Sequence, residues 1–353
     1  MKAEEIVKQD IKSIADSIRK EAEEFEGKSF LISGGAGFLG NYFVATLLEM
    51  NKSFRTPCKI IVMDNFITGS KKNTLGLDFS QDKNVEFMEY DVCNPLPTNI
   101  GADYLIHAAG LASPFYYQKY PLETIEVATS GTKNFLEFAK LKNAKSILYF
   151  SSSEIYGDPD PNQLPTPETY WGNVSCTGPR ACYDESKRLG ETLCSIYYNL
   201  YQVPVKVVRP FNVYGPGMKI DDYRVIPSFM AKAIRGEALL VHDKGSQTRT
   251  FCYVTDAVQG FFKVLASKHS GEVFNIGRQE EEINILNLAN TLSEVVPNRA
   301  RVQLINYPDS YPAGEPTRRC PDISKARKLL NYNPIVDLKT GLARTYVWFN
   351  EQA

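Results

Sequence analysis

Short runs of apolar residues alternate, over the first 210 residues, with longer stretches in which apolar residues recur every three or four positions. The short runs are typical of buried strands, and the longer stretches are typical of helices that cover them. Alternation of this kind predicts a parallel sheet with helices on both faces. We expect strands at 29–33, 59–64, 85–88, 104–107, 146–150 and 205–208, and helices at 40–50, 121–141 and 183–200.

The first 27 residues lie before this alternation and have a pattern of their own. Apolar side chains recur there at helical intervals, with charged residues between them, at positions 7, 11, 14, 18 and 25. This spacing predicts an amphipathic helix whose apolar face lies on the body of the protein or on a partner subunit. A membrane-surface helix is less favoured, because the polar face mixes acidic with basic residues.

Beyond Pro210 the pattern becomes mixed and richer in loops, as expected of a smaller lobe that closes over a site. We therefore divide the chain into three parts. These are the helix at 1–27, a sheet domain at 28–210 and a mixed α/β lobe at 211–353.

The composition narrows the classes of function. Forty basic and 41 acidic side chains leave a net charge of -1, so the basic excess of a nucleic-acid binder is missing. No apolar run approaches the roughly 20 residues needed to span a bilayer. The first 28 residues also lack the apolar segment of a signal peptide. We expect neither nucleic acid nor a membrane as a partner.

The seven cysteines are scattered and form no Cys-x-x-Cys pair, which predicts reduced thiols and a cytoplasmic protein. Cys182 adjoins a motif described below, where packing is favoured over a reactive thiol. His107, His242 and His269 lie far apart and match no metal-ligand spacing. We therefore expect no metal site and acid–base chemistry carried by other residue types.

A glycine motif follows the first predicted strand and opens a helix. Gly34, Gly37 and Gly40 have the spacing Gly-x-x-Gly-x-x-Gly. The first permits a tight turn, the second lets a pyrophosphate approach the backbone, and the third lets helix and strand pack closely. The helix N-terminus offers unpaired N–H groups to the phosphates. This context predicts a Rossmann-type, doubly wound parallel sheet that binds a dinucleotide.

An acidic residue, Asp64, ends the second predicted strand. A carboxylate there accepts hydrogen bonds from the adenosine ribose and repels a 2′-phosphate, so NAD is favoured over NADP. Asp91 and Val92 follow the third strand and are candidates for holding the adenine, with an ordinary surface loop as the alternative. Further candidate cofactor contacts, beside the same turns, are Phe38, Leu39 and Asn65.

Tyr183 and Lys187 stand one helical turn apart, after a strand that ends in three serines. A free tyrosine has a pKa of about 10 and is a poor base at neutral pH. A neighbouring ammonium group and a charged nicotinamide ring favour the phenolate. We expect Tyr183 to take a proton from a substrate hydroxyl, Ser152 to share that proton, and Tyr183 and Lys187 also to contact the cofactor.

These motifs together resemble the extended short-chain dehydrogenase/reductase family of sugar-nucleotide epimerases, dehydratases and decarboxylases. The resemblance covers residues 28 to 350. Within the family, the decarboxylases that act on UDP-glucuronate are the most similar, through the segments 153–159, 170–173, 178–185, 245–249 and 319–322. The resemblance implies NAD-dependent decarboxylation to UDP-xylose through a 4-keto intermediate, with internal recycling of NAD, in a homodimer that pairs helices beside Tyr183.

The resemblance also assigns residues. Glu154 would lie beside the sugar ring and assist proton transfers, and Arg319 would hold the carboxylate or steer its departure. The alternatives are a strand-end carboxylate satisfied by backbone N–H groups and a surface ion pair. Arg224 and Arg249 are candidates for the diphosphate, or solvated arginines. The full set of expected substrate contacts is Ser153, Arg180, Asn212, Arg224, Val225, Arg249 and Arg319.

The residues at positions 153 and 154 indicate which reaction of the family to expect. The family's 4,6-dehydratases carry an Asp-Glu pair there, and its 4-epimerases commonly carry small neutral residues, whereas this chain has Ser153 and Glu154. Both neighbouring reactions are therefore disfavoured, although a 4-epimerase or 4,6-dehydratase remains the alternative. An NAD-binding regulatory protein without chemistry is the alternative from another class, and the presence of both Tyr183 and Lys187 argues against it.

Three positions depart from the family pattern. Ala128 replaces an asparagine, Ser186 a glycine and Gly217 an arginine. The first could remove a support of the proton relay, and the three together are compatible with a related nucleoside diphosphate hexuronate as substrate.

Overall fold

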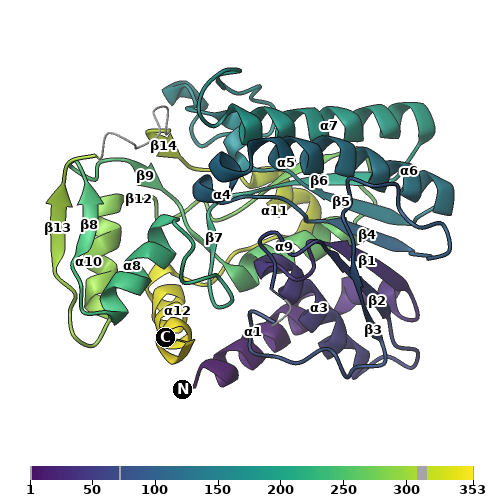
Figure 1. The fold of residues 1–353 in the computed structure, drawn as a ribbon, viewed down its shortest axis with the longest axis horizontal. Helices are drawn as coiled ribbons and strands as arrows, with labels where there is room; N and C mark the ends of the chain where they lie inside the picture. Colours follow the sequence, from purple (N-terminus) through teal and green to yellow (C-terminus); the bar gives the residue numbers. More distant parts are fainter. Residues whose placement is uncertain (1, 71–72, 308–315, 353) are drawn as a thin grey trace.

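The computed structural model describes residues 2–70, 73–307 and 316–352. Its centre is a seven-stranded sheet with the order β11-β6-β5-β4-β1-β2-β3, and every neighbouring pair is parallel (Figure 1). The α/β class and the parallel sheet are thus confirmed. The strands are β1 (Ser29–Ser33), β2 (Lys59–Asp64), β3 (Val85–Glu89), β4 (Tyr104–His107), β5 (Ser146–Phe150), β6 (Val205–Pro210) and β11 (Val273–Ile276).

Side chains alternate between the two faces of this sheet, because successive residues of a strand point to opposite sides. Phe30 and Ile32 of β1 enter the core on one face, and Leu31 between them enters the core on the other. Helices cover both faces, since every strand of the sheet centre is apolar on both sides. The covering helices are α3 (Phe38–Asn51), α9 (Val254–Ala266), α5 (Pro121–Glu126), α6 (Thr132–Lys142) and α7 (Ala181–Tyr201).

The expected single helix at 121–141 is interrupted. One π-helical turn, η2 (Val127–Gly131), separates α5 from α6. Gly131 lies here because a Cβ atom would come within 3.0 Å of Val92. The α-helical hydrogen-bond pattern therefore stops after α5 and resumes in α6, and the wider turn between them lies close to Val92.

The N-terminal segment packs on the body of the protein, as one of the two sequence interpretations held. It consists of α1 (Ala3–Ser17), α2 (Arg19–Ala22) and the short η1 (Glu23–Phe25). Val7 and Ile18 are fully buried, and α1 lies against α3, α9 and the C-terminal helix α12 (Leu338–Gln352), so that the two chain ends are neighbours (Figure 1).

The mixed lobe contributes smaller sheets and helices beside the carboxyl edge of the large sheet. The boundary at residue 210 stays a prediction, because the chain returns to the large sheet through α9 and β11. Three short helices not yet named precede residue 210; they are α4 (Pro114–Lys119), η3 (Ser153–Tyr156) and η4 (Pro161–Gln163). The other elements follow it; they are β7 (Val213–Tyr214), α8 (Val225–Ile234), β8 (Leu239–His242), β9 (Thr248–Arg249), β10 (Cys252–Tyr253), β12 (Ile283–Asn284), α10 (Ile285–Val295), β13 (Val302–Ile305), β14 (Arg318–Arg319) and α11 (Ser324–Leu330).

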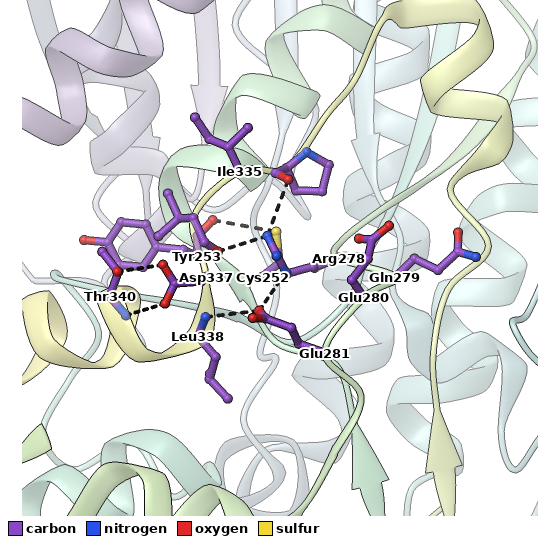
Figure 2. A network of polar contacts seen from close by, with 12 residues as sticks. Cys252, Tyr253, Arg278, Gln279, Glu280, Glu281, Ile335, Asp337, Leu338 and Thr340 are labelled. Atoms are coloured by element: carbon purple, nitrogen blue, oxygen red, sulfur yellow. Dashed lines mark hydrogen bonds and ion pairs between the residues drawn. The ribbon is translucent and has the colours of Figure 1, made fainter. Parts of the chain in front are cut away.

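A polar network fixes the segment that leads into α12. Arg278 pairs with Glu281 at 2.9 Å and donates to the carbonyl oxygens of Pro334 and Val336, while Glu281 accepts the N–H of Leu338 (Figure 2). The loop after β11 and the start of α12 are therefore held by charge-assisted hydrogen bonds rather than by sheet pairing.

A second polar cluster ties α1 to the lobe. Asp10 is fully buried, accepts a 2.5 Å hydrogen bond from the hydroxyl of Tyr253 and pairs with Arg344 at 3.0 Å. Burial raises the pKa of Asp10 to about 6, although the hydrogen bond from Tyr253 and the charge of Arg344 act to lower it.

The raised pKa of Asp10 predicts a specific dependence of stability on pH. An acid with a higher pKa in the folded chain binds its proton more tightly there, so its contribution to the free energy of unfolding falls as pH rises through this range. Relative to an Asp10→Asn variant, the native protein should lose about 1 kcal/mol of stability between pH 5 and pH 7, measured by urea unfolding. Parallel pH profiles for the two proteins would contradict this assignment.

Candidate active site

The glycine motif forms a cradle between β1 and α3. Gly34 has a φ of 66°, in the left-handed region that glycine adopts at no steric cost. A Cβ atom on Gly40 would lie 2.3 Å from the carbonyl oxygen of Gly34, so any side chain would push α3 away from the turn. Gly37 is the N-cap of α3, whose N-terminus therefore faces the cradle. This close, side-chain-free backbone fits a pyrophosphate.

Eight of the ten predicted cofactor residues lie together around one cavity of about 240 Å³, and the other two, Tyr183 and Lys187, line the neighbouring cavity. The sheet order reverses at β1, which is flanked by β2 and β4, and ligands of such sheets bind at this switch point. The cavity is lined by every predicted residue of the glycine and strand-end motifs: Gly34, Gly37, Phe38, Leu39, Asp64, Asn65, Asp91 and Val92. Their roles as cofactor contacts stay predictions.

The two acids predicted to hold the cofactor have different surroundings in this cavity. Asp64 accepts the N–H groups of Phe66 at 2.8 Å and Ala36 at 3.1 Å. Burial nevertheless raises the pKa of Asp64 above its ordinary value. For Asp91, burial also acts upward, but the N–H of Cys93 and the amide of Asn65 outweigh it and lower the pKa. Carboxyl groups at these two positions suit the hydroxyls of a ribose better than a phosphate.

The catalytic candidates meet where β5 ends and α7 begins. Ser152 follows β5 and caps η3, and it hydrogen-bonds with Tyr183, which is buried. Burial raises the pKa of Tyr183, while the hydroxyl of Ser152 and then Arg224 and Arg180 lower it. Lys187 donates instead to the carbonyl oxygen of Phe150 at 2.7 Å, and its Nζ lies 5.9 Å from the centroid of the Tyr183 ring.

The expectation that Lys187, together with a charged nicotinamide ring, makes the phenol acidic stays a prediction. Burial lowers the pKa of Lys187 to about 8. Burial also raises the pKa of Tyr183, and the hydroxyl of Ser152, followed by Arg224 and Arg180, acts to lower it. Lys187 acts here as a buried anchor that ties α7 to the end of β5.

Glu154 is held by arginines. Its oxygens meet Nη1 of Arg319 at 2.6 Å and Nη2 at 2.7 Å, a bidentate pair, and Arg180 also contacts one of them. Arg319 is only 5% exposed, so it forms no surface ion pair, and Glu154 is not a carboxylate satisfied by backbone N–H groups alone. Both of these alternatives are wrong. Arg180 reaches Asp184 as well, at 3.5 Å.

These groups open onto a second cavity of about 390 Å³, beside the first. Arg224 lines both cavities and pairs with Asp222 through Nη2 at 2.6 Å. Arg249 is buried and donates to the carbonyl oxygen of Pro316 at 2.7 Å, so it is not a solvated arginine. The second cavity contains all the predicted catalytic and substrate residues: Ser152, Ser153, Glu154, Arg180, Tyr183, Lys187, Asn212, Arg224, Val225, Arg249 and Arg319.

Backbone conformation places one of these residues. Asn212, in the loop between β6 and β7, has a φ of 42° and donates its amide to the carbonyl oxygen of Thr250 at 2.8 Å. Asparagine is among the few residues that tolerate this left-handed conformation. The bond joins the end of the large sheet to the mixed lobe at the cavity wall.

Sequence reasoning missed several lining residues. Tyr117 stacks on Tyr183 with ring centroids 5.3 Å apart. His242 and Tyr307 line the far end of the second cavity, with ring centroids 5.1 Å apart. The pairing of β8 with β13 brings them together, and no local sequence pattern predicts this pairing. Tyr117 follows Tyr116 in an aromatic cluster that gave no signal of its own.

The departures from the family pattern have local explanations. Gly217 has a φ of 92°, and a Cβ atom there would lie 2.7 Å from Leu75, so no arginine fits. The hydroxyl of Ser186 donates to the carbonyl oxygen of Tyr183 within the helix. Ala128 is buried in η2, where its carbonyl oxygen accepts a hydrogen bond from Thr132.

The described residues contain neither a candidate metal-binding cluster nor a candidate membrane-spanning helix. No group of three or more His, Cys, Asp and Glu side chains in this part of the chain lies close enough to hold a metal ion. No described helix is both long and apolar enough to cross a bilayer.

The geometry at Asp64 predicts the cofactor preference. An Asp64→Ser variant should bind NAD about 10- to 100-fold more weakly, because hydrogen bonds to a charged acceptor are lost. Its discrimination against NADP should shrink at the same time, since the negative charge is gone. Titration calorimetry with both cofactors measures this, with Asp78→Ser, an exposed position, as the matched control. Unchanged NAD affinity would show that Asp64 does not contact the ribose.

The comparisons with known proteins agree with this geometry. The pattern of the NAD dependent epimerase/dehydratase family matches residues 30–277. UDP-glucuronic acid decarboxylase 3 of Arabidopsis thaliana is 42% identical over 313 residues, which are 88% of this chain and 86% of that protein. UDP-glucuronic acid decarboxylase 1 of Danio rerio is 40% identical over 329 residues, 93% and 74% of the two chains.

A solved structure extends the likeness to three dimensions. The crystal structure of UDP-glucuronic acid 4-epimerase from Bacillus cereus, in complex with UDP-glucuronic acid and NAD, has a TM-score of 0.76 and 27% identity, covering 92% of this chain and 100% of that chain. Since the family pattern spans most of the chain and the relatives span nearly all of it, this chain belongs to the NAD-dependent epimerase/dehydratase family, and NAD is its cofactor.

Proposed function

We propose that this protein decarboxylates UDP-glucuronate to UDP-xylose through a 4-keto intermediate, with internal recycling of NAD. The relatives at 40–42% identity carry the name of this activity. The observation that carries the proposal is the position of Glu154 between Arg319 and Arg180, in the same cavity as Tyr183 and Ser152. A neutral hexose offers nothing for such a cluster of guanidinium groups to bind.

The charge of the cavity supports an anionic substrate. Among the described residues, five cationic side chains line it, against one carboxylate, that of Glu154; the five are Arg180, Lys187, Arg224, Arg249 and Arg319. A nucleoside diphosphate hexuronate brings a diphosphate and a sugar carboxylate, which complement this excess. Arginine is suited to both groups, because its planar fork pairs with phosphate and carboxylate in a bidentate way.

The reaction follows from the positions of these groups. Gly34, Gly37 and Asp64 would hold NAD, which when bound would supply the hydride acceptor for oxidation at C4 and the hydride donor for the later reduction at C4. Tyr183 takes the proton of the C4 hydroxyl, and Ser152 shares it through their hydrogen bond. Once C4 is a ketone, the C6 carboxylate is β to a carbonyl, and the electrons of the breaking C5–C6 bond are held as an enolate.

The arginine cluster serves the second half of the reaction. A guanidinium carries five N–H donors, and Arg319 uses one from each terminal nitrogen on Glu154. We infer that the substrate carboxylate takes its place beside this pair and that Glu154, which keeps the guanidinium in position, assists the proton transfer to C5. The 4,6-dehydratase alternative lacks its acid, because position 153 is a serine.

We further propose that the protein is a cytoplasmic homodimer. Exposed apolar side chains form a strip over α5 and α7, which pack against each other. Helical spacing puts the members on α7 on one face, and a two-fold axis would pair the strip with itself in a second copy. The strip consists of Leu122, Ile125, Leu189, Ile196 and Leu200. All seven cysteines are unpaired, as suits a reducing compartment.

A substitution at the base tests the chemistry. The native protein should release carbon dioxide from UDP-glucuronate and form UDP-xylose, and Tyr183→Phe should lower kcat by about 100-fold or more, because general base catalysis typically contributes that much. Binding of UDP-glucuronate should stay within about 3-fold. Product analysis by mass spectrometry measures the turnover, and titration calorimetry measures the binding. Tyr201→Phe, at an exposed tyrosine of the same helix, is the control. Activity retained in Tyr183→Phe, or a 4-keto-6-deoxy sugar or UDP-galacturonate as the product, would refute the proposal.

A charge in the apolar strip tests the dimer. Leu189→Glu places a carboxylate at the proposed two-fold interface, so it should give monomers in analytical ultracentrifugation at micromolar concentration. Ile335→Glu, at a position 71% exposed outside the strip, should behave as the native protein does. A monomeric native protein, or a dimer that survives the Leu189 substitution, would be evidence against this interface.

A further inference from the structure

An aromatic pair bridges the two halves of the protein above the active site. Phe115 belongs to α4, on the sheet side, and Tyr223 belongs to the loop that precedes α8 in the mixed lobe. Their rings stack with centroids 4.3 Å apart and planes inclined by 29°. Both side chains are nevertheless substantially exposed, Phe115 by 40% and Tyr223 by 60%. We call this pair the aromatic latch.

The aromatic latch lies at the border between the two cavities. Tyr116 and Asp222, the chain neighbours of the latch residues, line the cofactor cavity. Pro114, on the other side of Phe115, lines the substrate cavity together with Tyr223 itself. The two segments that meet through the latch therefore contribute residues to the walls of both cavities.

The helix that carries Phe115 also touches the catalytic tyrosine. Tyr117, two residues further along α4, is buried and stacks on Tyr183 with ring planes inclined by 17°. The thiol of Cys182 donates to the carbonyl oxygen of Tyr117 at 3.5 Å. Any displacement of α4 that opened the latch would thus also disturb the packing of Tyr183.

We propose that the aromatic latch keeps the 4-keto intermediate and the reduced cofactor on the enzyme between the two halves of the reaction. The inference rests on the proposed function, in which the same cofactor molecule must be reduced and then reoxidised. If either the ketone or the reduced cofactor leaves midway, the turnover ends without UDP-xylose. Phe115 and Tyr223 are positioning residues in this scheme, because they act by holding α4 against the loop at 218–224.

The size of the effect follows from the contact. A stacked aromatic pair shifts an open–closed equilibrium by about 2- to 12-fold. Phe115→Ala and Tyr223→Ala should each speed the release of NADH by a factor in this range. The measurement is stopped-flow fluorescence on enzyme loaded with NADH, which requires no turnover. Because one contact is removed in both cases, the double variant should release NADH no faster than the faster single variant.

Product partition gives the second readout. During turnover of UDP-glucuronate, both alanine variants should release more UDP-4-keto-pentose and NADH for each molecule of carbon dioxide, and correspondingly less UDP-xylose. This ratio is independent of the amount of active enzyme, so a merely destabilised protein would not change it. Tyr223→Phe keeps the ring and should partition as the native protein does. Ile335→Ala, which removes an exposed apolar side chain elsewhere, should do the same.

The outcomes separate the two proposals. Absence of carbon dioxide with native enzyme would refute the proposed function, while the rate of NADH release would still report on the latch. Native release of carbon dioxide with unchanged NADH release and unchanged partition in the alanine variants would overturn the latch alone. Additive acceleration in the double variant would also overturn it, because the two rings would then act separately. Tyr223→Leu, which keeps apolar bulk without a ring, should release NADH and UDP-4-keto-pentose as Tyr223→Ala does.

Discussion

The ion pair between Glu154 and Arg319 is the interaction on which the chemistry of this site depends. A carboxylate placed beside a buried tyrosine is costly unless cations accompany it. Glu154 lies in η3, just after β5, and its partner lies in β14, so the pair also joins the large sheet to the mixed lobe. Arg180 approaches the same carboxylate from the start of α7. Two distant segments thereby present guanidinium groups where an acidic sugar would lie, on either side of the carboxylate of a third.

Parallel pairing explains how such distant residues meet. The carboxyl ends of β1, β2, β4, β5 and β6 lie along one edge of the sheet, and each is followed by a turn that faces the cavities. The edge collects the glycine cradle, Asp64, Ser152 and Asn212 from points spread over the sheet domain. The mixed lobe then needs to add only a few arginines and aromatic side chains. Cofactor and substrate cavities are neighbours because their residues follow adjacent strands.

Local patterns were sufficient for much of this. Apolar periodicity predicted the central strands, and the glycine spacing with Asp64 located the cofactor cavity, because these signals depend on short stretches of backbone. Pairings over long sequence separation could not be predicted in this way. The contact of Arg319 with Glu154 spans 165 residues, and the stacking of Phe115 on Tyr223 joins the sheet domain to the mixed lobe. Neither the anchoring of Lys187 to Phe150 nor the π-helical turn at η2 left a trace in the residue pattern.

Burial gives the site its electrostatic character. It lowers the pKa of Lys187 and raises the pKa of Tyr183, while the hydroxyl of Ser152 and then Arg224 and Arg180 act to lower the pKa of Tyr183. The central claim is that oxidation at C4, loss of carbon dioxide and reduction at C4 occur in this one closed site. Turnover of UDP-glucuronate deuterated at C4, in ordinary water, tests it most directly. The UDP-xylose that forms should keep the deuterium at C4. Loss of the deuterium to solvent or to free cofactor, or an uncleaved hexuronate as product, would contradict it.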